Sequence, residues 1–311
     1  MAVPQLIEHN SNMARNNVDK YVEIFGRKRP RIYTKLNYRT QPTKMQFWKA
    51  MQEGGYGLMT VVAEGSEVTT SGFETSRETD FYWVKRGYGD ERSYESYETD
   101  IPGLTKKIAR KLAKGAEDTR ESLSANQFNN ATSTGAAYVG MDGVALVSTA
   151  HPDDVSWSNR GVDTGGSSNV DADLSATNLE LAIQKLMDTP NDKGNPDPRT
   201  GPFILYVPTA LAGLANRLTK ELSPQLPGGN ANDGNWAGGL ISNVVVNPWL
   251  TDDDAWFLID GSENGLFMVM HGSRLVEKDV NKRRQTIAII MTEKLSFFCE
   301  DPRGIWGSPG A

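Results

Sequence analysis

The sequence predicts an α+β protein in which projecting segments are attached to a smaller mixed body. Three observations support this class. Residues 56–100 contain eight aromatic residues and ten acids but no proline and a single leucine, which suits strands without a core of their own. A long amphipathic helix follows at residues 105–129, and from residue 136 onward short strands and helices alternate between Gly, Asp, Asn and Pro clusters.

Composition narrows the possible functions. The chain has 311 residues with 33 basic and 39 acidic side chains, a net charge of -6, so nucleic acid could be contacted only through a local basic patch. The single cysteine, Cys299, excludes an intrachain disulfide and is expected in the core. The sequence also lacks an apolar run of ~20 residues and a signal pattern, so we expect no membrane association.

Residues 1–52 are polar and predict an N-terminal arm with short helical turns, such as 45–51, laid along other structure. Its basic stretch holds Arg27, Lys28 and Arg29. These side chains are candidates for contact with another subunit. A solvated or salt-bridged face and a nucleic-acid contact are the alternatives.

Residues 53–90 predict an extended β-hairpin, with strand-forming stretches at 58–64, 67–74 and 80–85. Two strands alone are marginal in water, so we expect the hairpin to pack on a neighbouring subunit. Aromatic side chains are often central to interfaces. The expected anchors are Phe73, Phe81, Tyr82 and Trp83, and the alternative is that half of them pack within their own hairpin.

The helix at residues 105–129 carries Lys106, Lys107 and Arg110 near its start and acids further on. This order opposes the helix macrodipole, so helix stability does not explain it. A partner charge on another subunit, a packaged polyanion and a plain solvated face all remain open.

Further elements follow from hydrophobic patterning. Helices are expected at 174–188 and 209–220, and strands at 203–207, 244–246, 255–259, 266–270, 286–291 and 295–299.

No catalytic signature is present, and no cofactor or metal site is predicted. Ser148, His151 and Asp153 lie close together in the sequence, although triad members usually come from distant positions. The acidic residues 252–254 fit a polar turn better than a cation site.

Six blocks in a fixed order carry a resemblance to a known family. They are 142–152 (DGVALVSTAHP), 174–188 (LSATNLELAIQKLMD), 203–211 (FILYVPTAL), 243–252 (NVVVNPWLTD), 255–260 (AWFLID) and 292–304 (TEKLSFFCEDPRG). Together with the preceding hairpin and helix, they resemble the major capsid proteins of tailed bacteriophages, particularly relatives of the Mu-like major head subunit. The resemblance covers about residues 50 to 305.

The resemblance implies the HK97-type capsid fold. Its parts would be an N-terminal arm (1–52), an extended loop (53–90), a peripheral domain with its spine helix (91–135), an axial domain (136–267), peripheral return strands (268–285) and a final axial strand with the C-terminus (286–311).

The resemblance also implies a structural, non-enzymatic function. Such a chain assembles with itself into hexamers and pentamers of an icosahedral virion shell around double-stranded DNA, in the cytoplasm of a host bacterium. Scaffolding, portal and decoration proteins are further possible partners, and contact with the packaged DNA would be weak and non-specific. The alternatives are an encapsulin-like compartment shell and a hydrolase that uses His151.

Overall fold

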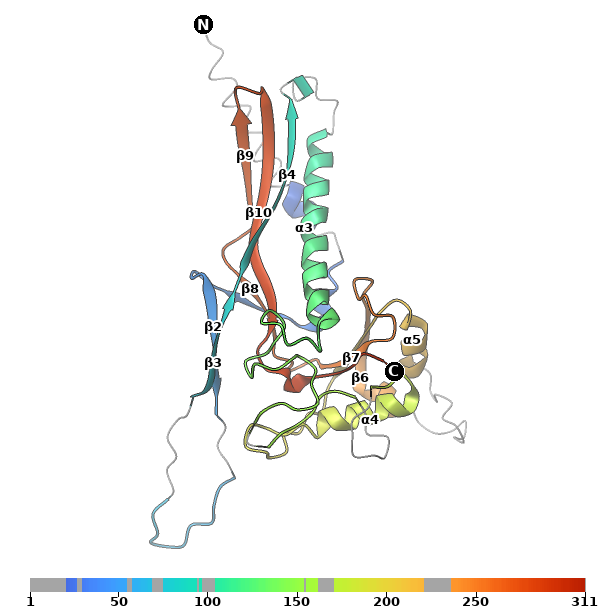
Figure 1. The fold of residues 1–311 in the computed structure, drawn as a ribbon. Coiled ribbons are helices and arrows are strands. Elements are labelled where there is room, and N and C mark those ends of the chain that lie inside the picture. The colour runs from blue at the N-terminus through green and yellow to red at the C-terminus, as the bar shows by residue number, and fades with distance from the viewer. Residues whose placement is uncertain are drawn as a thin grey trace.

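The computed structural model describes residues 21–26, 30–54, 58–68, 75–93, 95–96, 104–153, 155–161, 171–220 and 236–310. Figure 1 shows an elongated molecule with three parts. We call these the arm (α3 with β4, β9 and the first half of β10), the body (the sheet of β5, β6, β7 and β11 with its helices) and the hairpin (β2 and β3).

The described elements have the following bounds. They are η1 (Tyr33–Leu36), β1 (Arg39–Pro42), β2 (Phe47–Glu53), β3 (Thr75–Tyr82), β4 (Val84–Ser93), α3 (Leu104–Asn129), α4 (Ala176–Met187), β5 (Phe203–Val207), α5 (Ala212–Lys220), α6 (Trp236–Leu240), β6 (Ile241–Val246), β7 (Trp256–Asp260), β8 (Leu266–Met270), β9 (Leu275–Asn281), β10 (Thr286–Cys299), η2 (Pro302–Gly304) and β11 (Ile305–Ser308).

The long strand β10 connects the arm to the body. It pairs with β4 along ten residues, and its other edge pairs first with β9 and then with β8. Burial alternates along residues 286–291 and becomes continuous at 295–299. The strand is therefore covered on one face in the arm and on both faces where it enters the body.

Helix α3 covers the buried face of the arm sheet. Ile108, Leu112 and Ala116 form one apolar cluster with Ile289 and Met291 of β10. Their spacing of four residues places them on one face of the helix. The helix expected from the sequence is thus confirmed at nearly the same bounds.

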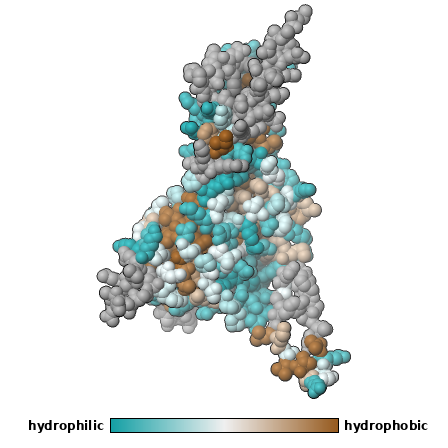
Figure 2. All heavy atoms as spheres, turned by 180° about the vertical axis from the view of Figure 1, so that it is seen from behind, coloured by the Kyte–Doolittle hydropathy of each residue, from teal (hydrophilic) through white to brown (hydrophobic). Residues whose placement is uncertain are grey.

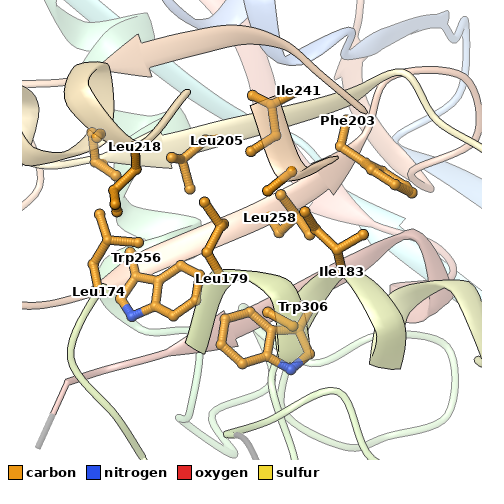
Figure 3. Close-up of a cluster of buried hydrophobic side chains, with 14 of the residues drawn as sticks. Leu174, Leu179, Ile183, Phe203, Leu205, Leu218, Ile241, Trp256, Leu258 and Trp306 are labelled. Atoms are coloured by element: carbon orange, nitrogen blue, oxygen red, sulfur yellow. The ribbon is translucent and has the colours of Figure 1, made fainter. Parts of the chain in front are cut away.

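The body is built on a four-stranded sheet in the order β11-β7-β5-β6. Strands β5, β7 and β11 are buried along their whole length, whereas the edge strand β6 is partly exposed. Figure 3 shows the core between this sheet and the helices, where Leu179 and Ile183 of α4 meet Trp256 and Trp306. The two indole rings lie 4.6 Å apart between centroids. The opposite face packs on Phe128 at the end of α3, which fixes the arm to the body.

The hairpin differs from the expected one. The helical turn predicted at 45–51 is wrong, because Phe47–Glu53 is strand β2 and pairs antiparallel with β3. Residues 58–64, expected as a strand, are irregular and exposed. Strand propensity depends on a paired neighbour, and β3 supplies one to β2 but not to this tip.

The last third of the chain also differs in one respect. The sequence predicts that residues 286–311 supply the final strand of the axial domain, with separate strands at 286–291 and 295–299. Instead, β10 is one continuous strand of the five-stranded sheet that also contains β1, β4, β8 and β9, and of residues 286–310 only β11 joins the body sheet, beside β7. The polar residues between the two expected strands stay paired with β4.

The predicted burial of Cys299 is confirmed, since its side chain lies fully inside the core. Burial raises the pKa of this thiol well above its ordinary value, which makes it a poor nucleophile. None of the helices in the described part of the chain combines the length and apolarity needed to cross a membrane.

Candidate functional site

The hairpin extends away from the rest of the molecule and exposes an apolar tip. Within residues 58–68, the exposed fractions of Leu58, Met59, Val61 and Val68 are 81%, 101%, 102% and 70%. Figure 2 shows these residues as a hydrophobic cluster at the far end of the projection. A soluble chain rarely holds several large apolar side chains in full contact with water unless they bind something.

The four predicted aromatic anchors have different surroundings. Phe81 is only 5% exposed and contacts Phe267 and Phe298 of its own chain, so its own subunit already covers most of this side chain. Tyr82 points to the other face of the strand, is 55% exposed and touches Phe47. Phe73 lies outside the described residues.

Trp83 is held within its own subunit. Its indole Nε1 donates to the carbonyl oxygen of Met45 over 2.8 Å, and its ring stacks on His271 at 4.9 Å. The ammonium of Lys294 lies over the same ring. Its half-buried side chain therefore helps to fix the root of the hairpin.

An ion-pair cluster joins the hairpin to the body. Arg77 on β3 pairs with Asp153 at 3.0 Å, and Arg303 pairs with the other oxygen of the same carboxylate at 2.7 Å. The indole of Trp157 also donates to Asp153. Because these groups are mostly buried, the cluster sets the direction in which the hairpin leaves the body.

The predicted basic residues of α3 all lie exposed on its first turns. The Lys106 ammonium sits 5.4 Å from the centre of the Tyr21 ring, and the Arg110 guanidinium 4.9 Å from that of Phe25. Lys107 makes no such contact within the described residues. The remaining candidates, Arg27, Lys28 and Arg29, lie outside the part of the chain that the structure describes.

Two acids of α3, Glu117 and Glu121, have a different role from its bases, because they are buried inside the arm. Glu117 pairs with Arg31 at 3.0 Å and with Arg274 at 3.0 Å. Arg274 and Arg120 both pair with Glu293 of β10. This network ties α3, the sheet and the chain segment before η1 into one unit.

Glu121 completes the attachment of that segment. Its carboxylate accepts hydrogen bonds from the backbone N–H groups of Ile32 (2.6 Å) and Tyr33 (3.2 Å). Burial raises the pKa of the Glu121 carboxyl, and these two hydrogen bonds act in the opposite direction. Burial also disfavours the charged form of Arg274 and so lowers the pKa of its guanidinium, whereas Glu117 acts to raise it.

The suggested hydrolytic group is not assembled. His151 is buried, with one ring nitrogen on Asp142 and the other 2.9 Å from Asn159. The Ser148 hydroxyl donates to the Ala150 carbonyl instead. Both ring nitrogens of His151 are thus occupied by structural partners, and none of the hydrogen bonds among the described residues joins it to Ser148.

Candidate cation ligands do not come together in the described ranges, where no group of three or more His, Cys, Asp or Glu side chains could hold a metal ion. In the acidic turn at 252–254, the backbone N–H of Asp254 donates to the carboxylate of Asp252 over 3.1 Å. This hydrogen bond is typical of an Asx turn.

The chain has an arm with a long helix, a projecting hairpin and a mixed α/β body. These three parts are typical of shell-forming subunits with the HK97-type fold. Solved structures share this fold. The capsid protein of cyanophage P-SCSP1u matches with a TM-score of 0.59 at 12% identity, over 91% of this chain and 88% of that one. The bacteriophage JBD30 capsid matches with a TM-score of 0.56 at 13% identity, over 72% and 92%.

A third structure of the same fold is a virus-like particle from Pyrococcus furiosus, with a TM-score of 0.52 at 9% identity over 94% of this chain and 98% of that one. The chain belongs to the phage capsid protein family, because the model of that family matches residues 80–306. The expected phage major capsid protein with the HK97-type fold is confirmed. No curated protein matches the chain significantly.

Sequence reasoning missed two features of the site. The apolar stretch around Met59 and Val61 gave a signal, because it lacked the alternation of a half-buried strand, but we assigned it to a strand. The second feature is the pairing of Glu117 with Arg274 and of Arg77 with Asp153, which leaves no signal in the sequence. These partners lie far apart in the sequence.

Proposed function

We propose that this capsid protein assembles into hexamers and pentamers that close into an icosahedral shell around double-stranded DNA, in the cytoplasm of a host bacterium. The observation that carries the proposal is the apolar tip at residues 58–68, which projects beyond the rest of the subunit (Figure 1). A second copy of this chain is its partner. The tip lies on a neighbouring subunit and loses its contact with water there.

Burying a Leu, Met or Val side chain contributes about 1.5 to 3 kcal/mol, so burial of the four exposed tip residues contributes about 6 to 12 kcal/mol, which offsets part of the cost of ordering the loop. In a closed shell every subunit both gives and receives such a contact. Several modest contacts that must break together hold a subunit far more tightly than any single one.

Other residues add to this interface. Tyr82 acts as an aromatic anchor, because much of its side chain is exposed and free to contact a neighbour. The basic residues Arg27, Lys28 and Arg29 remain candidates for contact with a neighbour. In the same proposal, the arm together with the second half of β10 is the peripheral domain, and the body is the axial domain. Portal, scaffolding and decoration proteins are further partners of the shell.

The chain has a structural role in this proposal and no catalytic one. The neighbours of His151 support that role, since they occupy both of its ring nitrogens. A protein compartment built from the same fold is the second candidate function, which the likeness to the virus-like particle supports. Particles that carry an enzyme cargo and no DNA would favour it.

The test replaces Met59 and Val61 together by Asp. We expect a folded chain with an unchanged unfolding midpoint, because neither side chain packs on its own subunit, but no closed shells in electron micrographs. The matched control is Met59→Leu with Val61→Ile, which keeps the tip apolar and should give normal shells. Normal shells from the Asp variant would show that the tip is not the assembly contact.

A further inference from the structure

The first half of α3 exposes a continuous basic surface. Within nine positions it carries five basic side chains, and all five are exposed to solvent. They are Lys106, Lys107, Arg110, Lys111 and Lys114. We call this set the basic row.

The basic row is a narrow stripe. With 3.6 residues per turn, Lys107, Arg110, Lys111 and Lys114 fall within about 100° of the helix circumference. From Lys107 to Lys114 the stripe is about 10 Å long at 1.5 Å per residue. One strand of a DNA duplex carries about three phosphates over that axial length, at 3.4 Å each.

Two of the three acids of α3 point away from this row. Glu117 and Glu121 point into the arm, where Arg31, Arg274 and two backbone N–H groups bind them. Lys107, Lys111 and Lys114 form no ion pair with any other residue that the structure describes. The half-buried Asp118 is the next ionisable side chain along the stripe.

The arm has opposite charges on its two faces. On β9, Val276 packs on α3, so the exposed Glu277 and Asp279 point to the far face of the sheet by strand alternation. Glu91 of β4 lies on that far face too, since Glu91 and Asp279 are both paired with Ala288. Exposed basic side chains thus dominate the helix face, whereas the far face of the sheet carries these three acids beside Lys85.

A second basic group lies at the same end of the arm. The turn between β9 and β10 holds Lys282, Arg283 and Arg284, all exposed. Figure 1 shows this turn beyond the first turns of α3. Positive charge is therefore found both along the first turns of α3 and at the end of the arm.

We infer that the basic row binds the phosphate backbone of the packaged double-stranded DNA, so that the exposed face of α3 lines the inside of the shell. This inference rests on the proposed function. It assigns Lys106, Lys107 and Arg110 to DNA rather than to a neighbouring subunit. The positive end of the helix dipole adds to the same attraction.

The chemistry of the row favours DNA over a protein surface. Protein interfaces are depleted in Lys at their centre and contain apolar or aromatic anchors. Four of the five side chains of the basic row are lysines, and no apolar residue of α3 lies within its stripe. Aromatic rings lie against two of the five, Lys106 and Arg110. An evenly charged, flexible set of ammonium groups suits a polyanion that is contacted without regard to sequence.

The experiment compares two triple variants of the full-length chain with equal loss of charge. The row variant carries Lys107→Gln, Lys111→Gln and Lys114→Gln, and Gln keeps a helix propensity close to that of Lys. The control variant carries Lys44→Gln, Lys85→Gln and Lys220→Gln, three exposed lysines outside the row. Binding of the unassembled chain to a short random-sequence duplex is titrated at several salt concentrations, and shells are examined in micrographs.

Each neutralised phosphate contributes about 0.9 to the slope of log affinity against log salt. We therefore expect the row variant to lose about 2.7 from that slope and to form normal shells, whereas the control keeps the slope of the unmodified chain. An unchanged slope, or an equal loss in both variants, would overturn the inference. So would a folded row variant that forms no shells, because the row would then lie between subunits.

The two proposals can fail separately. If the unmodified chain forms no shells, the proposed assembly is wrong. The duplex titration still decides whether the basic row binds DNA, because it uses unassembled chains.

Discussion

At the scale of single residues, Asn159 holds together the part of the body nearest the hairpin root. Its Nδ2 donates to the carbonyls of Leu146 (2.8 Å) and Ile305 (3.0 Å). Its Oδ1 accepts from the backbone N–H of Ser148 (2.8 Å) and lies 2.9 Å from the His151 ring. Four otherwise separate groups thus depend on one buried amide.

We expect Asn159→Ala to destabilise the unassembled chain by about 3 kcal/mol or more, because each buried polar group left without a partner costs about 1 to 3 kcal/mol. Asn159→Asp should also destabilise it, since a carboxylate cannot donate to the two carbonyls. Urea unfolding of the free chain measures both effects. A loss below about 0.5 kcal/mol, typical of surface positions, would contradict this account.

Residue roles in this region could be predicted only in part. The sequence drew attention to His151 because Ser, His and Asp lie close together, yet the histidine is a buried structural residue. What decides its role is Asn159, eight positions away, and Asp142, nine positions away. Nothing in the local pattern marks either as its partner. The burial of Cys299, by contrast, follows from its apolar neighbours.

At the scale of elements, α3 and the body strands could be predicted because their apolar residues follow the period of the element. Strand β2 could not, because Met, Lys and Ala within it favour helix and its pairing with β3 is a tertiary effect. For β10, the sequence pattern predicts two strands instead of one, because the polar residues 292–294 separate its two apolar stretches. Glu293 is one of them, and it is polar because it binds Arg120 and Arg274.

Two glycines give opposite predictions for their elements. Gly115 lies exposed in the middle of α3, and a Cβ there would meet nothing within 4 Å. Gly115→Ala should therefore stabilise the free chain by about 1 kcal/mol through helix propensity.

Gly304 in η2 is the contrasting case, because a Cβ there would overlap the backbone carbonyl of Glu263. We expect Gly304→Ala to cost about 3 kcal/mol, in the range of overpacked cores. Thermal and urea unfolding of the two variants measure both effects. A destabilised Gly115→Ala chain would show that α3 is not a regular helix with an exposed face at this position.

At the scale of the whole molecule, the body, the arm and the hairpin have different roles. The body contains most of the core, and the buried ion pairs of Glu117 and of Asp153 attach the arm and the hairpin to the rest at fixed angles. The arm and the hairpin then present surfaces that can contact other molecules. Apolar residues dominate at the hairpin tip and cations along α3, so the two projections are suited to different partners.

This division predicts how a protease will treat the free chain and the shell. Residues 58–68 are exposed in the free subunit and contain Glu64 and Glu67, so a glutamate-specific protease should cut there first. If a neighbouring subunit covers the tip, cleavage requires that contact to open. Burial of two apolar side chains contributes about 3 kcal/mol, which reduces the open population about 100-fold, and the cleavage rate follows that population. Shells dissociated under mild conditions should regain the fast rate, and equal rates in intact shells and free chains would mean that the tip remains exposed after assembly.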